Sequence, residues 1–377
     1  MKHEKERVCA NMRQAAEFVQ SLLQENYDLG EITKVEPIKA GDTNNSFFAI
    51  AKKDGEEKKW YVRQYNTAEQ ERDIIYEHAF EKYYSANVNG AMQTMTPVVN
   101  RTGKTWLVAE FEGQSNFYAV FNTISGLEPY SWEYNEMPQE ARDSCAEICA
   151  RFQSWAYGYV GPEGSGRREP ELEELFKVWK QDLPAAQEEK KQNPKVFKRF
   201  TDYFEKEIPY LIDTIDFCDS ELAKCREQLK KCICHKDLNP GNVMFDENDK
   251  IIAVFDLDWV NTDYRLYDLG WMSYQALASW DTATWGDVAV EKIGRFISIY
   301  NQTMKETGCE LGELNDAERM FYPVMMIIGA VKVIMDFTCY ENHESEVHRM
   351  FVNTWRFVES VHFMREHLDE IRAAIAD

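Results

Sequence analysis

The chain opens with apolar positions at helical spacing and then changes to an alternating pattern. Apolar residues recur every three or four positions, at Val8, Met12, Ala15, Phe18 and Leu22, which predicts an amphipathic helix over residues 8–26. Residues 34–66 then read as strand, small polar loop, strand, turn and strand. The dipeptide Asp54-Gly55 separates the strand-like segments 47–51 and 60–65, and Asp-Gly is typical of a two-residue β-hairpin turn.

The pattern predicts two parts of different character. A helix is expected at about 67–86, a strand near 96–99, a turn at 101–104 and a strand that ends at Gly113. The first 113 residues are therefore predicted to be mostly antiparallel sheet with one inserted helix. Helical periodicity dominates the rest of the chain, over residues 138–158, 171–184, 195–230, 285–307, 315–340 and 345–375, and only 232–259 has strand character. We expect an α+β protein with domains at 1–113 and 114–377.

Composition narrows the class of protein. A chain of 377 residues with 44% hydrophobic residues can bury a core and is too long for one small domain. The net charge of −22 disfavours nucleic acid and anionic membranes as partners. The most apolar run, residues 320–337, is interrupted by Pro323, Lys332 and Asp336, so it is expected to be a buried helix. Nine irregularly spaced cysteines and an N-terminus without a signal-peptide core indicate reduced thiols and a cytoplasmic protein.

Residues 234–259, CHKDLNPGNVMFDENDKIIAVFDLDW, carry the candidate chemistry. Asp237 follows His235 by two positions, Asn242 follows Asp237 by five, and Asp256 ends an apolar strand. This spacing is that of a kinase catalytic loop, in which the Asp accepts a hydroxyl proton and the Asn binds a metal. Mg²⁺ prefers such oxygen ligands. The same residue types are also the ordinary residues of turns, so a solvated turn is the alternative interpretation.

The segments HKDLNPGNVMFD, VFDLDW and YRLYDLG resemble the aminoglycoside phosphotransferase and choline kinase family. The resemblance implies a protein-kinase-like fold of two lobes, a small antiparallel β lobe and a larger, mainly helical lobe. It also implies ATP and Mg²⁺ as cofactors and a small hydroxylated metabolite as substrate. By residue, Asp237 matches the catalytic base, Asn242 and Asp256 match the metal ligands, and Asp258 matches an acidic position that assists the metal. Lys236 stands where glycine is commoner, either lowering the pKa of Asp237 or pointing to solvent.

The resemblance also assigns the nucleotide-binding residues of the first lobe. Arg63, which alternation places with Tyr61 and Tyr65, matches the position of the phosphate-binding cation. Its carboxylate partner on the next helix is expected to be Glu77, with Glu81 one turn away as the alternative. The remaining expected contacts are a phosphate-covering loop with Asn45 and Ser46, and a linker at 110–113 whose residues Glu110, Phe111 and Glu112 meet the adenine. An exposed edge-strand arginine and a solvated glutamate are the simpler alternatives.

Three other functions compete with this hypothesis. A protein kinase would carry a Gly-rich triplet, an Asp-Phe-Gly and an Ala-Pro-Glu segment, none of which occurs in the sequence. A non-catalytic nucleotide-binding protein would not need Asp237, Asn242 and Asp256 together. A metal hydrolase would need a His-rich ligand set, and His235 has no partner at such spacing. The sequence does not identify the substrate, the hydroxyl that is phosphorylated, the preference between ATP and GTP, or the oligomeric state.

Overall fold

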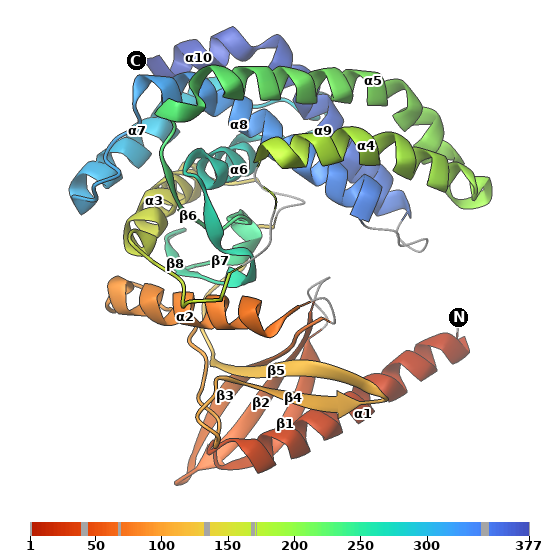
Figure 1. The fold of residues 1–377 in the computed structure, drawn as a ribbon, viewed down its shortest axis with the longest axis vertical. Helices are drawn as coiled ribbons and strands as arrows, with labels where there is room; N and C mark the ends of the chain where they lie inside the picture. Colours follow the sequence, from red (N-terminus) through yellow and green to blue (C-terminus); the bar gives the residue numbers. More distant parts are fainter. Residues whose placement is uncertain are drawn as a thin grey trace. The chain divides into compact units, whose positions relative to one another are not determined.

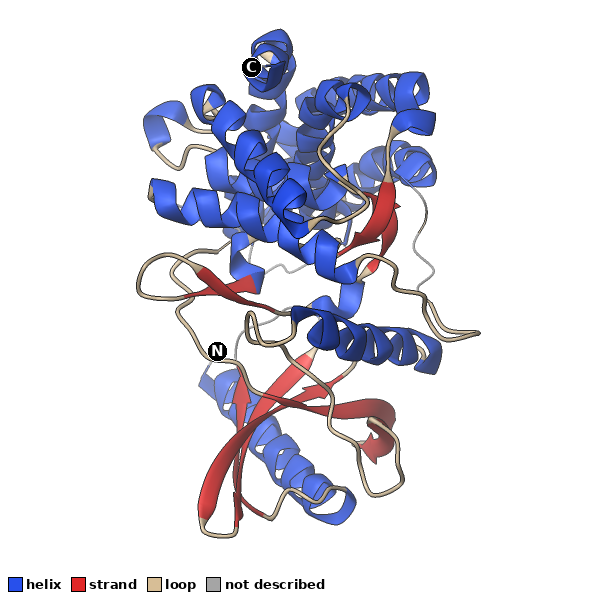
Figure 2. Cartoon of the chain, turned by 90° about the vertical axis from the view of Figure 1, so that its left-hand side faces the viewer, coloured by secondary structure: helices blue, strands red, loops and turns tan. Residues whose placement is uncertain are grey.

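A computed structural model describes residues 2–38, 44–66, 69–131, 136–166, 170, 172–340 and 347–376, with side chains described except at 2–12, 282, 340 and 376. The chain forms two compact units. The first comprises Met1–Ser125 and Tyr159–Arg167, and the second comprises Gly126–Gly158 and Arg168–Asp377. Strands predominate in the first unit and helices in the second, as the colours of Figure 2 show.

The first unit is built on a five-stranded antiparallel sheet of order β1-β2-β3-β5-β4. Its strands are β1 (Glu31–Ile38), β2 (Asn45–Lys53), β3 (Glu56–Gln64), β4 (Trp106–Phe111) and β5 (Gln114–Asn122). Asp54 and Gly55 join β2 to β3 with φ of 54° and 89°. Both central residues of a type I′ turn require positive φ, so the hairpin predicted from this dipeptide is confirmed.

A second hairpin replaces the linker that was expected at residues 110–113. Glu112 and Gly113 have φ of 50° and 77°, and the chain turns back there to pair Phe111 with Gln114. The chain leaves the sheet only after β5, so the predicted boundary at residue 113 is too early. The strand expected near 96–99 is also wrong. Pro97 makes one isolated bridge to Phe121, and proline cannot donate a ladder hydrogen bond.

Two helices accompany the sheet. Helix α1 (Lys2–Asn26) lies along one face, as Figure 1 shows. There Val19 and Leu23, both at most 1% exposed, join a core with Phe47 and Val62 of the sheet. Helix α2 (Glu71–Val88) follows β3, close to the predicted 67–86. The helical periods of the sequence predicted both helices because each buries one face and exposes the other.

The second unit is mainly helical, as expected. Its helices are α3 (Gln139–Ala156), α4 (Leu172–Lys191), α5 (Pro194–Cys225), α6 (Leu266–Leu277), α7 (Val290–Thr307), α8 (Asp316–Met335), α9 (Val347–Glu366) and α10 (Leu368–Ala376). Two short strand pairs hold the candidate loop, namely β6 (Lys231–Cys234) with β9 (Asn261–Tyr264), and β7 (Val243–Phe245) with β8 (Ile251–Val254). The apolar segment Asp316–Cys339 is long enough to span a membrane but has 78% of its apolar window buried in this unit, which is typical of a core helix.

The cysteines behave as small apolar residues. Among the eight whose side chains are described, all have free thiols. Five are buried, namely Cys145, Cys149, Cys218, Cys232 and Cys234, whereas Cys225, Cys309 and Cys339 are partly exposed. Burial raises the pKa of the thiols of Cys145, Cys149, Cys218 and Cys234, so they stay protonated and unreactive in the folded chain.

Candidate active site

A buried carboxylate fixes the backbone of the candidate catalytic loop. Asp268, in the first turn of α6, accepts hydrogen bonds from the backbone N–H of His235 at 2.6 Å and of Lys236 at 2.9 Å. Its side chain is fully buried, and burial raises its pKa to about 6. Lys236 takes the left-handed conformation with φ of 71°. The two hydrogen bonds therefore hold a strained turn immediately before Asp237.

His235 braces this loop. Its Nε2 donates to the carbonyl of Phe255 at 2.9 Å, and the backbone N–H of Asp237 donates to its Nδ1 at 3.3 Å. These bonds fit a neutral ring with the proton on Nε2. Burial lowers the pKa of His235, which keeps the ring uncharged. His235 thus joins the catalytic loop to the strand end that carries Asp256.

Lys236 neither points to solvent nor acts as the main cation beside Asp237. Its side chain is buried, forms an ion pair with Asp263, and lies 3.9 Å from the centre of the Tyr267 ring. The cation that lowers the pKa of Asp237 most is Lys332. No sequence pattern predicted this pairing, because Asp263 lies far along the chain on β9.

Asp237 and Asn242 are hydrogen-bonded to each other. Asn242 Nδ2 donates to both the backbone carbonyl and the carboxylate Oδ2 of Asp237, each at 2.8 Å. Asn239 Nδ2 donates to the same carbonyl at 3.0 Å, and its Oδ1 accepts from the N–H of Gly241 at 2.8 Å. The interpretation of this segment as a solvated turn is therefore incomplete. The residues typical of a turn are present, and the turn directs the side-chain amide of Asn242 to the carboxylate of Asp237.

Two charged groups, one on α8 and one directly after it, act on Asp237, and both were noted in the sequence only as interruptions of an apolar run. Lys332 Nζ lies 3.0 Å from Asp336 Oδ2, with 33% and 37% of the two side chains exposed. Burial raises the pKa of Asp237 to about 6, while Lys332 lowers it and Asp336 raises it. Asp336 begins a π-helical turn, Asp336–Tyr340. Such turns are frequent at functional sites, and only the packing of α8 brings this one to the loop.

The residues expected to hold a metal lie around one backbone hydrogen bond. The N–H of Phe255 donates to the carbonyl of Asn242 at 3.0 Å, which sets Asn242 beside the strand end that carries Asp256. Asp256 is left-handed, with φ of 61°, and Asp258 follows in the 3₁₀ turn Leu257–Trp259 with 3% exposure. Because Nδ2 of Asn242 is directed to Asp237, its Oδ1 remains as a ligand atom. One amide oxygen and two carboxylates fit the ligand chemistry of Mg²⁺.

In the first unit, Arg63 is paired with Glu77. Arg63 Nη1 lies 2.9 Å from Glu77 Oε1, and the side chains are 5% and 1% exposed. Tyr65 donates to Glu77 Oε2 at 3.1 Å and contacts His78 Nε2 at 3.0 Å. Strand β3 lies between β2 and β5, so the alternatives of an exposed edge-strand arginine and a solvated glutamate are wrong. Glu81 is also buried, and the expected ion pair between Arg63 and Glu77 is present.

Three buried side chains of α2 resemble a metal cluster, but hydrogen bonds already engage Glu77 and His78. Ligand atoms of Glu77, His78 and Glu81 lie within 4.8 Å of one another. However, both ring nitrogens of His78 are engaged, Nε2 with Tyr65 and Nδ1 with Thr105 at 2.7 Å. Burial lowers the pKa of His78 to about 3. We therefore interpret the cluster as the support that orients Glu77 toward Arg63.

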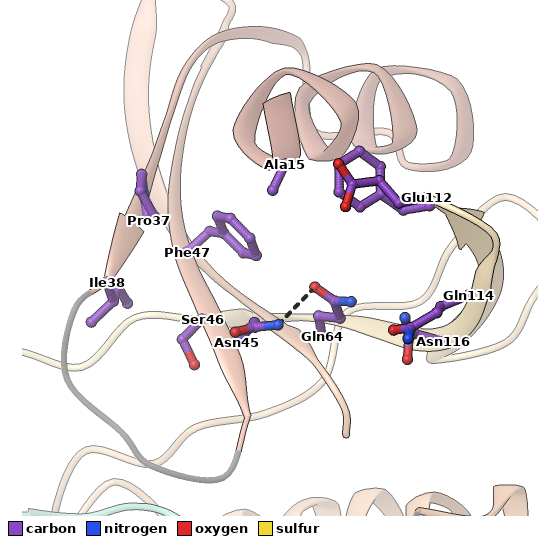
Figure 3. A pocket seen from close by; sticks show the side chains of 11 residues that line it. Ala15, Pro37, Ile38, Asn45, Ser46, Phe47, Gln64, Glu112, Gln114 and Asn116 are labelled. Carbon is purple, nitrogen blue, oxygen red and sulfur yellow. Dashed lines mark hydrogen bonds between the residues drawn. The ribbon is translucent and has the colours of Figure 1, made fainter. Parts of the chain in front are cut away.

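Asn45 and Ser46 begin strand β2 and do not form a loop. Ser46 pairs directly with Arg63, so these two side chains share a face, and Ser46 Oγ lies 2.7 Å from Tyr61 Oη. Asn45 lies on the opposite face, where its Nδ2 donates to Gln64 Oε1 at 3.3 Å (Figure 3). Residues 39–43, just before Asn44, lie outside the described residues. Only Ser46 of the pair is placed to act together with Arg63.

A pocket of about 350 Å³ lies on the α1 face of the sheet, away from Arg63. Figure 3 shows Ala15 of α1 on one side of it and Phe47, Asn45 and Glu112 around it. The residues expected to meet adenine belong to this end of the β4–β5 hairpin. Phe111 packs against Phe18 of α1, with the two rings tilted and their centres 4.9 Å apart, whereas Glu110 is exposed on β4. Glu110, Phe111 and Glu112 were assigned to the adenine site because a linker was expected there. The structure has a hairpin at this position, so that reason for the assignment no longer holds.

Comparisons with known proteins bear on the family and the fold of this chain. The family model described as the phosphotransferase enzyme family matches residues 34–301. Among curated proteins, no match is found. Solved structures do match. A microcompartment-associated aminopropanol kinase has a TM-score of 0.63 at 14% identity, covering 94% of this chain and 98% of that one. Amicoumacin kinase in complex with AMP-PNP and Ca²⁺ has a TM-score of 0.63 at 15% identity, covering 92% of each chain.

A third similar structure is choline kinase from Cryptosporidium parvum, with a TM-score of 0.60 at 12% identity, covering 96% of this chain and 98% of that one. Identities this low show a shared fold and leave the substrate open. The protein-kinase-like fold class predicted from the sequence is confirmed. The family model covers well over half of the sequence, including both Arg63 and the candidate loop. The chain belongs to the phosphotransferase enzyme family.

Proposed function

We propose that this protein transfers the γ-phosphate of ATP to a hydroxyl group of a small metabolite, with Mg²⁺ bound at Asn242 and Asp256. The observation that carries the proposal is the position of Asn242. Its side-chain amide reaches the carboxylate of Asp237 at 2.8 Å, and its backbone carbonyl accepts from Phe255 at 3.0 Å. One residue thus links the candidate base to the strand end that carries the candidate metal ligand.

Asp237 acts on the acceptor hydroxyl. Its pKa of about 6 leaves it ionised at pH 7, so it can accept a hydrogen bond from the hydroxyl and take its proton as the phosphoryl group transfers. Asn242 keeps the carboxylate oriented, and the Asp268 hydrogen bonds keep the backbone beneath it fixed. Mg²⁺ supplies charge neutralisation on the phosphates when it is bound. The transition state is loose, so positioning of this kind provides most of the rate.

Arg63 is the proposed phosphate-binding cation of the first unit. A guanidinium binds phosphate oxygens in a bidentate way, and Glu77 holds this one from the opposite side at 2.9 Å. The buried chain of contacts from Glu77 through Tyr65 and His78 to Thr105 keeps Glu77 from rotating away.

A coupled ADP-release screen tests the proposal. The panel contains sugars, amino sugars, amino alcohols, homoserine and aminoglycosides, and we expect at least one of them to stimulate ADP release in the presence of Mg²⁺. Asp237→Asn should abolish that stimulation while ATP binding, measured by calorimetry, persists. Asp237→Asn with near-full turnover would refute the assignment of the base. Phosphate transfer to a general protein substrate and to no metabolite would favour a protein kinase instead.

A further inference from the structure

One arginine in the helical unit is buried without an acceptor. Arg356, on α9, is 0% exposed. Its Nε, Nη1 and Nη2 atoms all lack a hydrogen-bond partner in the part of the chain that the structure describes. An uncompensated buried charge costs several kcal/mol, and burial lowers the pKa of this guanidinium. A buried guanidinium is therefore expected to have a hydrogen-bond acceptor.

The same unit shows how it treats a buried arginine that has a structural role. Arg265 is also 0% exposed. Its guanidinium donates to Glu318 Oε1 at 2.7 Å, to the carbonyl of Gly312 at 2.6 Å and to that of Glu313 at 2.8 Å, and it forms an ion pair with Glu318. Arg265 therefore needs no ligand. Arg356 has the same burial and none of these acceptors.

Aromatic rings surround Arg356 and leave its N–H groups free. Its Cζ lies 3.3 Å from the centre of the Trp280 ring, 5.2 Å from Phe357, 5.8 Å from Trp285 and 5.9 Å from Tyr274. Rings stacked on a guanidinium stabilise its charge through its faces. They offer no acceptor to the five N–H donors in its plane. The arrangement lacks an oxygen-bearing anion in that plane.

A second unsatisfied donor lies beside Arg356. The indole Nε1 of Trp285, whose ring centre lies 5.8 Å from Arg356 Cζ, is a buried donor without a hydrogen-bond partner among the described residues. Tyr274 of α6 lies 5.9 Å from the same Cζ. Tyr274 is six residues after Asp268 in the same helix, which is about 9 Å along the axis. Arg356 therefore lies near the helix that holds the catalytic loop.

Resting on the proposed function, we propose that Arg356 is the anchor of a buried anion site whose occupant is a carboxylate of the acceptor substrate. A carboxylate matches the planar fork of a guanidinium with two parallel hydrogen bonds. One guanidinium neutralises one negative charge, so the site fits a carboxylate monoanion better than a phosphate dianion. In this proposal the acceptor is a hydroxylated acid.

The first test measures binding without turnover. We would follow thermal unfolding of the full chain in sodium acetate, chloride and sulfate at equal ionic strength. Acetate should raise the Tm of the wild type in a saturable way, and the effect should be lost in Arg356→Met and reduced in Arg356→Lys. Arg295→Met is the matched control, because Arg295 is exposed and paired with Asp143 at 2.6 Å, and its acetate response should equal that of the wild type.

The second test compares acceptors that differ only in the carboxylate. Homoserine is paired with 3-amino-1-propanol, and gluconate with sorbitol, in the ADP-release assay. Arg356→Met should raise the KM of an active carboxylated acceptor at least tenfold and leave that of its uncharged partner unchanged. If Arg356→Met does not fold, Arg356→Lys and the wild-type acetate titration still decide the question.

The outcomes separate the two proposals. If no acceptor releases ADP but acetate still stabilises the wild type through Arg356, the anion site stands and the proposed function fails. Saturable acetate binding with no preference for carboxylated acceptors would assign the site to a free anion and overturn the substrate assignment. Equal acetate responses in the wild type and Arg356→Met would overturn the anion site and leave the aromatic rings and water as its only partners.

Discussion

Asp268→Asn tests whether the catalytic loop is held by the two backbone hydrogen bonds described above. Asparagine keeps the volume of the side chain but can accept only one of the N–H groups of His235 and Lys236, now at 2.6 and 2.9 Å. Loss of one charge-assisted hydrogen bond and one buried N–H left unsatisfied together cost about 3 to 5 kcal/mol. Expressed in kcat, this is on the order of a hundred- to several-thousandfold.

The same substitution should change global stability little. Burial raises the pKa of Asp268 to about 6 from 3.8, so its ionised form is disfavoured in the folded state by about 3 kcal/mol. The folded state binds the Asp268 proton more tightly than the unfolded state does. The cost is therefore absent below pH 4, where both states are protonated, and complete above pH 6, where both are ionised. Asparagine removes the cost together with the hydrogen bonds. The expected result at pH 8 is a large loss of kcat with a small change in Tm.

Steady-state ADP release at saturating ATP and thermal unfolding at pH 8 measure both quantities. Asp246→Asn is the control, because Asp246 also accepts two backbone hydrogen bonds, from Asn248 at 2.8 Å and Lys250 at 2.9 Å, but on a surface turn. Its kcat should stay within twofold of the wild type. The reasoning is refuted if Asp268→Asn keeps kcat within threefold, or if Asp246→Asn loses as much.

Three further outcomes are expected. The pH profile of kcat/KM should fall on its acid side near pH 6, where Asp237 becomes protonated. Lys332→Met should move this acid limb to higher pH, because Lys332 lowers the pKa of Asp237. An acid limb that does not move would contradict the interaction between Lys332 and Asp237. Asp256→Ala should abolish Mg²⁺-dependent nucleotide binding in a calorimetric titration, and unchanged affinity would exclude it as a ligand. Arg63→Met and Glu77→Gln should each destabilise the protein by about 3 to 5 kcal/mol in urea unfolding, because each leaves a buried charge unpaired. Wild-type stability in either variant would show that the pair is dispensable.

Local patterns predicted those parts of the fold that expose one face to water. Helix α1 and the β2–β3 hairpin were predicted because their buried and exposed positions alternate with the period of the element. Helix α6 was not identified by its pattern, because all of its residues from Leu266 to Leu277 are buried and a fully buried helix shows no apolar stripe. Strand β5 was missed because Glu112, an unusual residue for a turn with positive φ, gave no hairpin signal.

Spacing predicted the site only within one segment of chain. Asp237 and Asn242 are five residues apart, and the turn between them brings Asn242 Nδ2 to 2.8 Å from Asp237 Oδ2. The local sequence is therefore enough to predict that these two side chains meet. Lys332 and Asp336 lie on a helix about a hundred residues later, and only tertiary packing brings their charges to Asp237. The sequence pattern did not identify Arg356, for a different reason. What distinguishes it is the absence of an acceptor among its described neighbours, which a sequence does not record.

The five buried thiols can report local opening of the folded chain, because each reacts only when it is exposed to solvent. Cys145, Cys149, Cys218, Cys232 and Cys234 are shielded from solvent, whereas Cys225, Cys309 and Cys339 are partly accessible. A maleimide pulse followed by peptide mapping with mass spectrometry would therefore label the accessible set first, and a later adduct at one of the five buried positions would mark a shielded sulfur exposed by a fluctuation. Because all five of these shielded sulfurs belong to the helical unit, adducts at these positions would report local opening of that unit without an engineered probe.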